Sequence, residues 1–237
     1  MVVFFALLSC VTAALGAVLA GSVFQHAGGQ LTAAFLNLIC MGMIGCGMAL
    51  NRSKKWRNLI LFCVGFGTIE LLADSLCVEV TKTLDYSVSH SWVILSSPWW
   101  MPLSWALVAC QIMLLSDALA RLLGKRYQII AAGTLSVAML AFHEHAAYAA
   151  HWWQYKNCSL IGKAPLYVLL AELLIGGMLG WFMMQTTATL TLWDVLRMVI
   201  IAGGCTVLAG IIGFGCVEVI PVLLQGKPHP LMPFVFK

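Results

Sequence analysis

Residues 59–80 read LILFCVGFGTIELLADSLCVEV, an apolar run that holds three acidic side chains. Its length matches the roughly 20 residues that a helix needs to cross the hydrocarbon core of a bilayer. The run does not alternate between apolar and polar residues, so it favours a helix over a strand of a membrane barrel. Glu70 and Asp74 are four residues apart and share one helix face. This stretch predicts a transmembrane helix that carries a polar site.

Six further apolar runs of similar length surround this one, at roughly residues 2–23, 31–50, 102–123, 129–148, 166–184 and 196–224. The whole chain is 62% hydrophobic and 9% charged, whereas soluble domains are roughly 45–50% apolar and about 25% charged. No internal repeat or domain linker is visible. We therefore predict one all-α domain over residues 1–237, a polytopic transmembrane bundle of about seven spans whose surroundings are membrane lipid.

The basic residues predict the orientation of this bundle, because short loops rich in Lys and Arg face the cytoplasm. Residues 51–57 form the densest basic cluster, and a short turn at residues 25–29 joins the first two spans. The alternation of spans places the N-terminus in the cytoplasm and the C-terminus outside, in a bacterial inner membrane. The net charge of +4 is too small and scattered for a nucleic-acid surface. Eight of the 13 basic residues fall on the cytoplasmic side: Arg52, Lys54, Lys55, Arg57, Arg121, Lys125, Arg126 and Arg197.

Acidic and histidine side chains inside the spans mark the candidate site, since ionisable groups in a membrane are costly and usually functional. Glu144 and His151 follow in the fifth span and Glu172 in the sixth. With Glu70 and Asp74, all fall in the outer half of their helices, and Glu144, Tyr148 and His151 return to one helix stripe. We expect a cavity that opens outward. Its aromatic walls would come from Trp99, Trp100, Trp105, Trp152, Trp153 and Tyr155.

Several of these residues also have a plainer interpretation. Paired tryptophans often act as anchors at the membrane surface rather than as walls of a ligand site. Glu79, His151 and Glu218 could lie at the outer interface, where charged side chains reach water at small cost. Near the cytoplasmic ends, the spacings Asp117 to Arg121 and Asp194 to Arg197 predict local ion pairs.

Three kinds of function fit this constellation. An intramembrane enzyme could use acid–base chemistry to cyclise, hydrate or isomerise an isoprenoid or another lipid-like substrate, because a carboxyl group in a dry site keeps a proton that it can donate. Glu70 and Glu144 would be the principal pair, with Asp74 and His151 tuning them. The alternatives are a proton-coupled carrier or binding protein for a small apolar or amphipathic molecule, or a structural subunit whose protein partners the sequence does not identify.

No cofactor is predicted, although a metal ion would find suitable ligand types in Glu70, Asp74, Glu144 and His151. Di-iron carboxylate bundles use the spacing Glu-x-x-His on two helices, and this chain has no such motif. A retinal Schiff base is excluded because the seventh span has no internal lysine.

Two resemblances follow from these residues. ELLAD at residues 70–74 and SPWWMPLSW at 97–105, extended through Glu144, WWQY at 152–155, APLY at 164–167 and Glu172, resemble an uncharacterised family of multi-pass prokaryotic membrane proteins. That family implies a membrane fold and no activity. In size, span count and buried acids the chain is also similar to the small transmembrane terpene cyclases, whose early and late acids Glu70 and Glu218 match in rough position. It lacks that family's Trp-Glu dipeptide, because Ile69 precedes Glu70.

Overall fold

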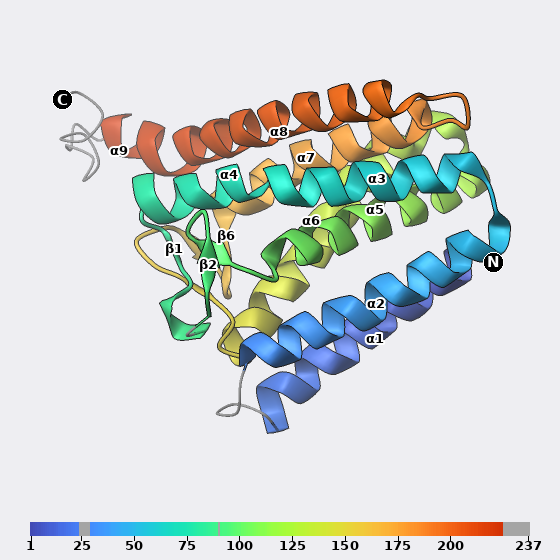
Figure 1. The fold of residues 1–237 in the computed structure, drawn as a ribbon. Coiled ribbons are helices and arrows are strands. Elements are labelled where there is room, and N and C mark those ends of the chain that lie inside the picture. The colour runs from blue at the N-terminus through green and yellow to red at the C-terminus, as the bar shows by residue number, and fades with distance from the viewer. Residues whose placement is uncertain (24–28, 90, 225–237) are drawn as a thin grey trace.

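The computed structural model describes residues 1–23, 29–89 and 91–224 and shows an all-α bundle (Figure 1). Seven helices are long and apolar enough to cross a membrane. The third and seventh continue through a turn of π-helix near their ends. The predicted turn at 25–29 and the predicted outer C-terminus fall largely outside the described residues. The helices are α1 (Val2–Val23), α2 (Gly29–Asn51), α3 (Lys54–Ile69) with α4 (Leu71–Ser75) and η1 (Leu76–Val80), α5 (Met101–Leu123), α6 (Gln128–Ala149), α7 (Leu166–Gln185), and α8 (Leu192–Phe214) with η4 (Gly215–Val219) and α9 (Ile220–Leu224).

Local sequence explains where several helices begin and end. Ser53 caps α3 by accepting a hydrogen bond from the backbone N–H of Lys55. At the start of α8, Thr191 and Asp194 form a reciprocal capping box. The Asp194 carboxylate accepts hydrogen bonds from Thr191 in this cap, and Arg197 acts on it electrostatically without a close ion pair among the described contacts. The predicted pair of Asp117 with Arg121 is confirmed.

Helix α5 lies at the centre of the bundle and contacts α1, α2, α3, α6 and α7, while α8 packs against α3 and α7. Helices α1 and α2 form a hairpin along α5 and α6 (Figure 1). Small residues allow backbones to approach closely at these contacts. A Cβ atom added to Gly67 of α3 would lie 2.2 Å from the carbonyl oxygen of Pro102 in α5, and one added to Gly176 of α7 would lie 2.6 Å from that of Ala132 in α6.

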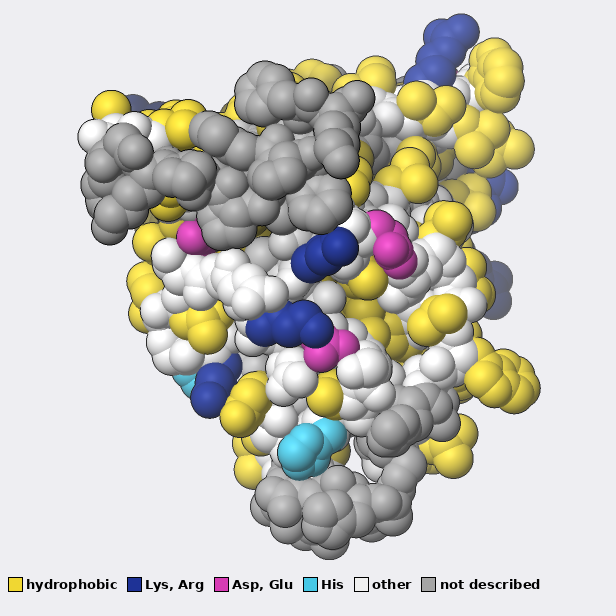
Figure 2. All heavy atoms as spheres, turned by 90° about the vertical axis from the view of Figure 1, so that its left-hand side faces the viewer, with side chains coloured by type: hydrophobic (Ala, Val, Ile, Leu, Met, Phe, Trp, Pro, Cys, Tyr) yellow, Lys and Arg dark blue, Asp and Glu magenta, His cyan; other side chains and the backbone are white. Residues whose placement is uncertain are grey.

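Short strands form a cap at one end of the bundle, the left-hand side of Figure 1. In the view onto this end, charged side chains lie among polar and backbone atoms, with hydrophobic side chains towards the flanks (Figure 2). Antiparallel pairs join β1 to β4, β2 to β3 and β5 to β6. The strands are β1 (Leu84–Asp85), β2 (Val93–Ile94), β3 (Ser97–Pro98), β4 (Gln154–Tyr155), β5 (Leu160–Ile161) and β6 (Ala164–Pro165).

The two hairpins β2–β3 and β5–β6 share one strand register, although Leu95 and Ser96 both have positive φ in the first turn and only Gly162 does in the second. Val93 pairs with Pro98 in the first, and Leu160, 67 positions later, pairs with Pro165 in the second. The hydrogen bond that closes each hairpin is also repeated, from Trp99 N–H to the Trp92 carbonyl and from Leu166 N–H to the Ser159 carbonyl, both at 2.9 Å. Each hairpin leads directly into a helix that returns through the bundle, α5 or α7.

This match extends to the helices on both sides and reveals an internal repeat. Residues 54–123 and 128–185 each run as a long helix with a buried acid, a strand, a hairpin and a returning helix. Asp74 lies ten residues before Leu84 of β1, and Glu144 lies ten residues before Gln154 of β4. Strands β1 and β4 pair with each other antiparallel, as two copies related by a two-fold axis would. The sequence shows no such repeat, and the likeness lies in the order and register of the elements.

The two π-helical turns carry the same four residues and hold one hairpin each. Both read CVEV, at residues 77–80 and 216–219. The Glu79 carboxylate accepts a 2.7 Å hydrogen bond from Ser96 Oγ beside β3, and Glu218 accepts one of 2.7 Å from the Ser159 N–H beside β5. Turns of π-helix are rare and often occur at functional sites. Here both glutamates fix the cap that covers this end of the bundle.

Candidate functional site

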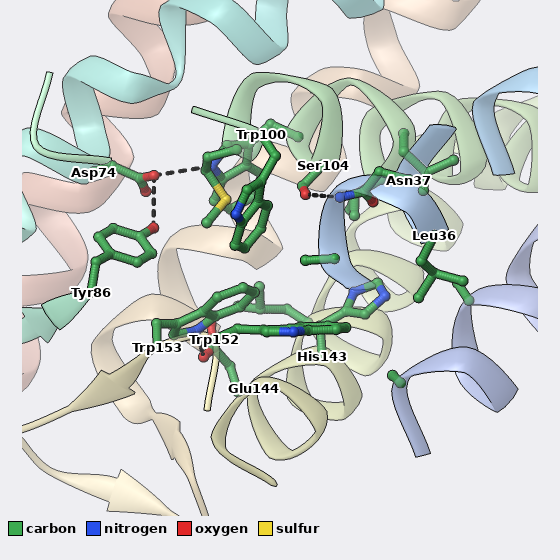
Figure 3. A pocket seen from close by; sticks show the side chains of 18 of the residues that line it. Leu36, Asn37, Asp74, Tyr86, Trp100, Ser104, His143, Glu144, Trp152 and Trp153 are labelled. Carbon is green, nitrogen blue, oxygen red and sulfur yellow. Dashed lines mark hydrogen bonds between the residues drawn. The ribbon is translucent and has the colours of Figure 1, made fainter. Parts of the chain in front are cut away.

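A cavity with a volume of about 70 Å³ lies beneath the cap, bounded by α1, α2, α4, α5 and α6. A water molecule needs only about 10–15 Å³ of such space, so the cavity can hold several waters or a small ligand group. Its walls are mainly aromatic and aliphatic, and Figure 3 shows how Trp100 faces the rings of Trp152 and Trp153 across it. Asp74, Glu144 and His143 supply the ionisable lining groups.

Asp74 occupies one side of the cavity and is held by three donors. Its Oδ2 accepts hydrogen bonds from the Tyr86 hydroxyl at 2.9 Å, the Ser97 hydroxyl at 3.1 Å and the Trp105 indole N–H at 3.3 Å. These donors come from the cap and from α5, so the cap orients the carboxyl group (Figure 3). Among the described residues Oδ1 accepts no hydrogen bond, and this oxygen remains for a ligand.

Glu144 is the counterpart of Asp74 in the second repeat and is held in the same manner. Its Oε2 accepts a 2.6 Å hydrogen bond from the Trp153 indole N–H, and its Oε1 accepts one of 3.3 Å from the Tyr155 hydroxyl. The carboxyl group is buried. Both acids are thus fixed by an aromatic donor that follows them in the chain, which places two equivalent carboxyl groups beside one cavity.

The two tyrosines of the cap remain hydrogen-bond donors at any ordinary pH. Burial raises the pKa of Tyr86 well above its usual value, and the neighbouring Asp74 adds to that rise. Burial also raises the pKa of Tyr155, with a further contribution from Glu144. Loss of a phenolic proton would place a second negative charge against a carboxylate, so these hydroxyl groups act as fixed donors.

Three tryptophans form a triangle around the cavity, with ring centroids 6.2 Å apart in each of the pairs between Trp100, Trp152 and Trp153. Trp100 and Trp152 are only 2% and 6% exposed. Within the described part of the chain, the indole N–H groups of Trp100 and Trp152 have no hydrogen-bond partner. A buried donor without a partner costs about 1–3 kcal/mol, so each of these two N–H groups lowers the stability of the fold unless it gains an acceptor.

The structure separates two of the predicted site residues from this cavity. Glu70 and Glu172 are both buried in the bundle, but neither is among the described residues that line the cavity. Glu172 accepts a hydrogen bond from Ser136 of α6, whereas Glu70 lies beside the Thr206 hydroxyl of α8. Glu70 and Glu144, expected as the principal pair, therefore face different surroundings.

His151 and Trp99 also lie away from the cavity. Helix α6 ends at Ala149, and His151 adopts a positive φ of 54°, so it leaves the helix stripe on which Glu144 lies. Its side chain is exposed. Trp99 is 39% exposed, while its neighbour Trp100 turns into the cavity. In the described residues, no three His, Cys, Asp or Glu side chains come close enough to hold a metal, so the four candidate ligands do not form one site.

Sequence reasoning did not identify three residues that shape the cavity: Asn37, Tyr86 and Ser104. Asn37 of α2 donates a hydrogen bond to Ser104 of α5, and these polar residues within apolar runs were a signal that could have been used (Figure 3). Tyr86 lies in a loop, where no helical spacing links it to Asp74. Its role depends on the cap folding back over the helix ends.

Comparison with known proteins gives a family but no activity. No curated protein and no solved structure matches the chain, so the similarity to terpene cyclases has no support from these comparisons. The family model for a domain of unknown function (DUF6989) matches residues 71–217. That segment includes Asp74, Glu144 and all six cap strands, and it leaves out α1 and α2. More than half of the sequence is covered, and the chain belongs to the DUF6989 family.

Proposed function

We propose that this protein is a multi-pass protein of a bacterial inner membrane that binds a small apolar or amphipathic molecule in the cavity beneath its cap. The orientation rests on the positive-inside rule. The basic end of the bundle, at the connections α2–α3, α5–α6 and α7–α8, is opposite the cap. In this orientation the N-terminus is cytoplasmic and the cavity lies on the outer side of the membrane.

The observation that carries the proposal is a cavity whose lining combines two carboxyl groups, those of Asp74 and Glu144, with the rings of Trp100, Trp152 and Trp153. Polar groups inside a membrane protein are costly unless they have partners. Within the described residues the buried indole N–H groups of Trp100 and Trp152 have no partner. A bound molecule with an acceptor atom would supply one, and its apolar part would pack against the rings.

The internal repeat favours a carrier or binding protein. Many transporters consist of two repeats with the substrate bound between them. Asp74 and Glu144 occupy equivalent positions in the two repeats and line the same cavity. A ligand bound by both acids would sense any motion of one repeat against the other, which is what a carrier requires.

An acid–base enzyme is the second candidate, favoured by the same two carboxyl groups. A general acid and a general base must both reach one substrate. Asp74 and Glu144 line one cavity, so they replace Glu70 and Glu144 as the proposed pair. An isoprenoid or other lipid-like substrate would place its apolar part against the tryptophan rings.

The test is mass spectrometry of the gently purified protein, which analyses bound small molecules and metals without prior choice of a ligand. We expect one stoichiometric molecule that is lost in Trp100→Phe and Asp74→Asn but retained in Trp193→Phe, a control that alters a tryptophan 66% exposed on α8. Finding bulk phospholipid alone would contradict the proposal. With the molecule identified, product formation in detergent would indicate an enzyme, whereas flux confined to sealed vesicles would indicate a carrier.

A further inference from the structure

We propose that the occupant of the cavity carries a positively charged amine or quaternary ammonium group, held between Asp74 and Glu144 and against the tryptophan rings. This inference rests on the proposed function and adds the chemical class of the ligand. It depends on four features of the cavity: its charges, the vacant acceptor on Asp74, its aromatic faces and its size.

Among the described residues, the cavity holds two carboxyl groups, each able to carry a negative charge, without a basic partner. Its described lining includes the acids Asp74 and Glu144 and no lysine or arginine. Two basic residues of the cap are engaged elsewhere, because Lys156 pairs with Asp85 at 3.2 Å and Lys163 lies over the Tyr148 ring at 3.7 Å. Opposite charges attract far more strongly in a dry site than in water. A cation is therefore the ligand charge that these two acids select.

The hydrogen bonds leave room for that cation. All three protein donors to Asp74 reach Oδ2, so Oδ1 can face a ligand. The donors on Glu144 come from Trp153 and Tyr155, both of which line the cavity. These donors hold each carboxyl group in place, which reduces the ordering cost that ligand binding would otherwise carry.

The aromatic residues provide the faces that such a group prefers. A cation within about 6 Å of an aromatic ring is attracted by the ring's electron-rich face, and tryptophan is the best of these rings. Trp100, Trp152 and Trp153 surround the cavity, with Tyr86 next to Trp153 at a centroid distance of 6.2 Å. Quaternary ammonium groups, which cannot donate hydrogen bonds from nitrogen, are bound elsewhere by aromatic cages of this composition.

The unpartnered indole N–H groups add a second requirement. Trp100 and Trp152 can only donate, so an acceptor oxygen on the ligand near its cationic group would give these N–H groups a partner. The cavity of about 70 Å³ suits a compact head group rather than a whole lipid. A cationic nitrogen a few bonds from a hydroxyl, ester or phosphate oxygen meets both conditions, whether it is a free solute or the head group of a lipid.

The test measures binding of radiolabelled choline to the full chain in nanodiscs made from lipids without choline head groups. The competitor is 3,3-dimethylbutan-1-ol, which has the shape of choline without the charge. We expect choline to bind at least about tenfold more tightly than this alcohol, the ratio that a desolvated cation–π and charge interaction implies. Equal affinity for the two, or no saturable choline binding, would overturn the inference.

Matched variants locate the effect. Asp74→Asn and Glu144→Gln keep the side-chain shapes, so each should weaken choline at least about tenfold and leave the affinity for the neutral alcohol unchanged. Glu79→Gln, which alters an acid outside the cavity, should change neither. Because the alcohol reports an intact cavity, a variant that loses both ligands has misfolded, and the other acid variant then decides the question. Unchanged choline affinity in both acid variants would overturn the inference.

Competition with a short-chain lysophosphatidylcholine distinguishes the two sources of the head group. If it displaces choline at lower concentration than free choline does, the natural ligand is a lipid, and if it competes more weakly, the ligand is a free solute. Both results support a cationic ligand. If the purified protein contains a stoichiometric molecule without a cationic nitrogen, the inference fails while the proposed binding function stands.

Discussion

Replacing Gly67 with alanine should separate α3 from α5 and disturb the cavity. A Cβ atom at this position would lie 2.2 Å from the Pro102 carbonyl oxygen and 2.6 Å from the Ala106 nitrogen, both backbone atoms of α5. Real Cβ contacts are essentially never closer than 3.0 Å, so the helices must part by about 0.8 Å at this point. Gly204 of α8 is the matched control, because nothing described lies within 4 Å of its added Cβ.

The expected energies have opposite signs in the two variants. Alanine is favoured over glycine inside a helix by roughly 0.8–1 kcal/mol, and Gly204→Ala should gain up to that amount. Overpacking costs about 1–3 kcal/mol, so Gly67→Ala should be less stable than Gly204→Ala by a difference of that size. For a chain of this length, 1 kcal/mol corresponds to a change in melting temperature of roughly 2–4 °C.

The displacement should also reach the site. Trp105, next to Ala106, donates to Asp74 across 3.3 Å, and a shift of about 0.8 Å is enough to stretch that distance beyond hydrogen-bonding range. Thermal unfolding in detergent, followed by circular dichroism, measures the stability of both variants, and choline binding measures the site. Equal melting temperatures for Gly67→Ala and Gly204→Ala would refute the reasoning, because the close backbone contact would then carry no cost.

Three further predictions concern the site, the cap and the orientation. Trp153→Phe removes the donor to Glu144 and should lower stability by about 1.5–3 kcal/mol in chemical denaturation; an unchanged midpoint would contradict the bond. Hydrogen bonds from Ser87 lower the pKa of Asp85, so this carboxylate stabilises the fold above about pH 4 and less as the pH falls. Asp85→Asn should lower the melting temperature at pH 7 and by a smaller amount at pH 3, because the contribution disappears only as the pH falls through the lowered pKa of the folded state; a larger loss at pH 3 than at pH 7 would argue against this linkage. In intact cells, an impermeant maleimide should label Lys163→Cys but not Lys125→Cys in a chain without native cysteines, and the reverse pattern would invert the orientation.

The helices could be predicted from sequence because apolar runs long enough to cross a bilayer are compatible with few structures other than transmembrane helices. The helix predicted for residues 59–80 ends at Val80 in the structure as well. The internal repeat could not be predicted in this way. Its halves share a hairpin register and a buried acid, but Asp74 is matched by a glutamate and Trp100 by Tyr167. The similarity of the two halves is visible in their backbone hydrogen bonds and not in their residue types.

The sequence predicted at what depth in the membrane the site residues lie, but not which of them face one another. Depth grouped Glu70, Asp74, Glu144 and Glu172 at one end, and all four are buried there. Depth does not determine which face of a helix contacts which neighbouring helix. Of these four acids, only Asp74 and Glu144 are among the described residues that line the cavity. His151 was misplaced because helical spacing was extended past Ala149, where the chain turns into the cap.

The pairing of β1 with β4 bears on how a molecule enters. These strands join the two repeats beside the cavity, which Tyr155 of β4 and the nearby Tyr86 both line. Separating the repeats at this end would therefore first break backbone hydrogen bonds. The α1–α2 hairpin, which forms another wall through small residues such as Ala13 and Ala33, is held to α5 by side-chain packing and the Asn37 to Ser104 bond. A sideways motion of α1 and α2 would leave the backbone hydrogen bonds of the β1–β4 pair intact. A molecule would then enter laterally from the lipid, while the strand pair keeps the two repeats together.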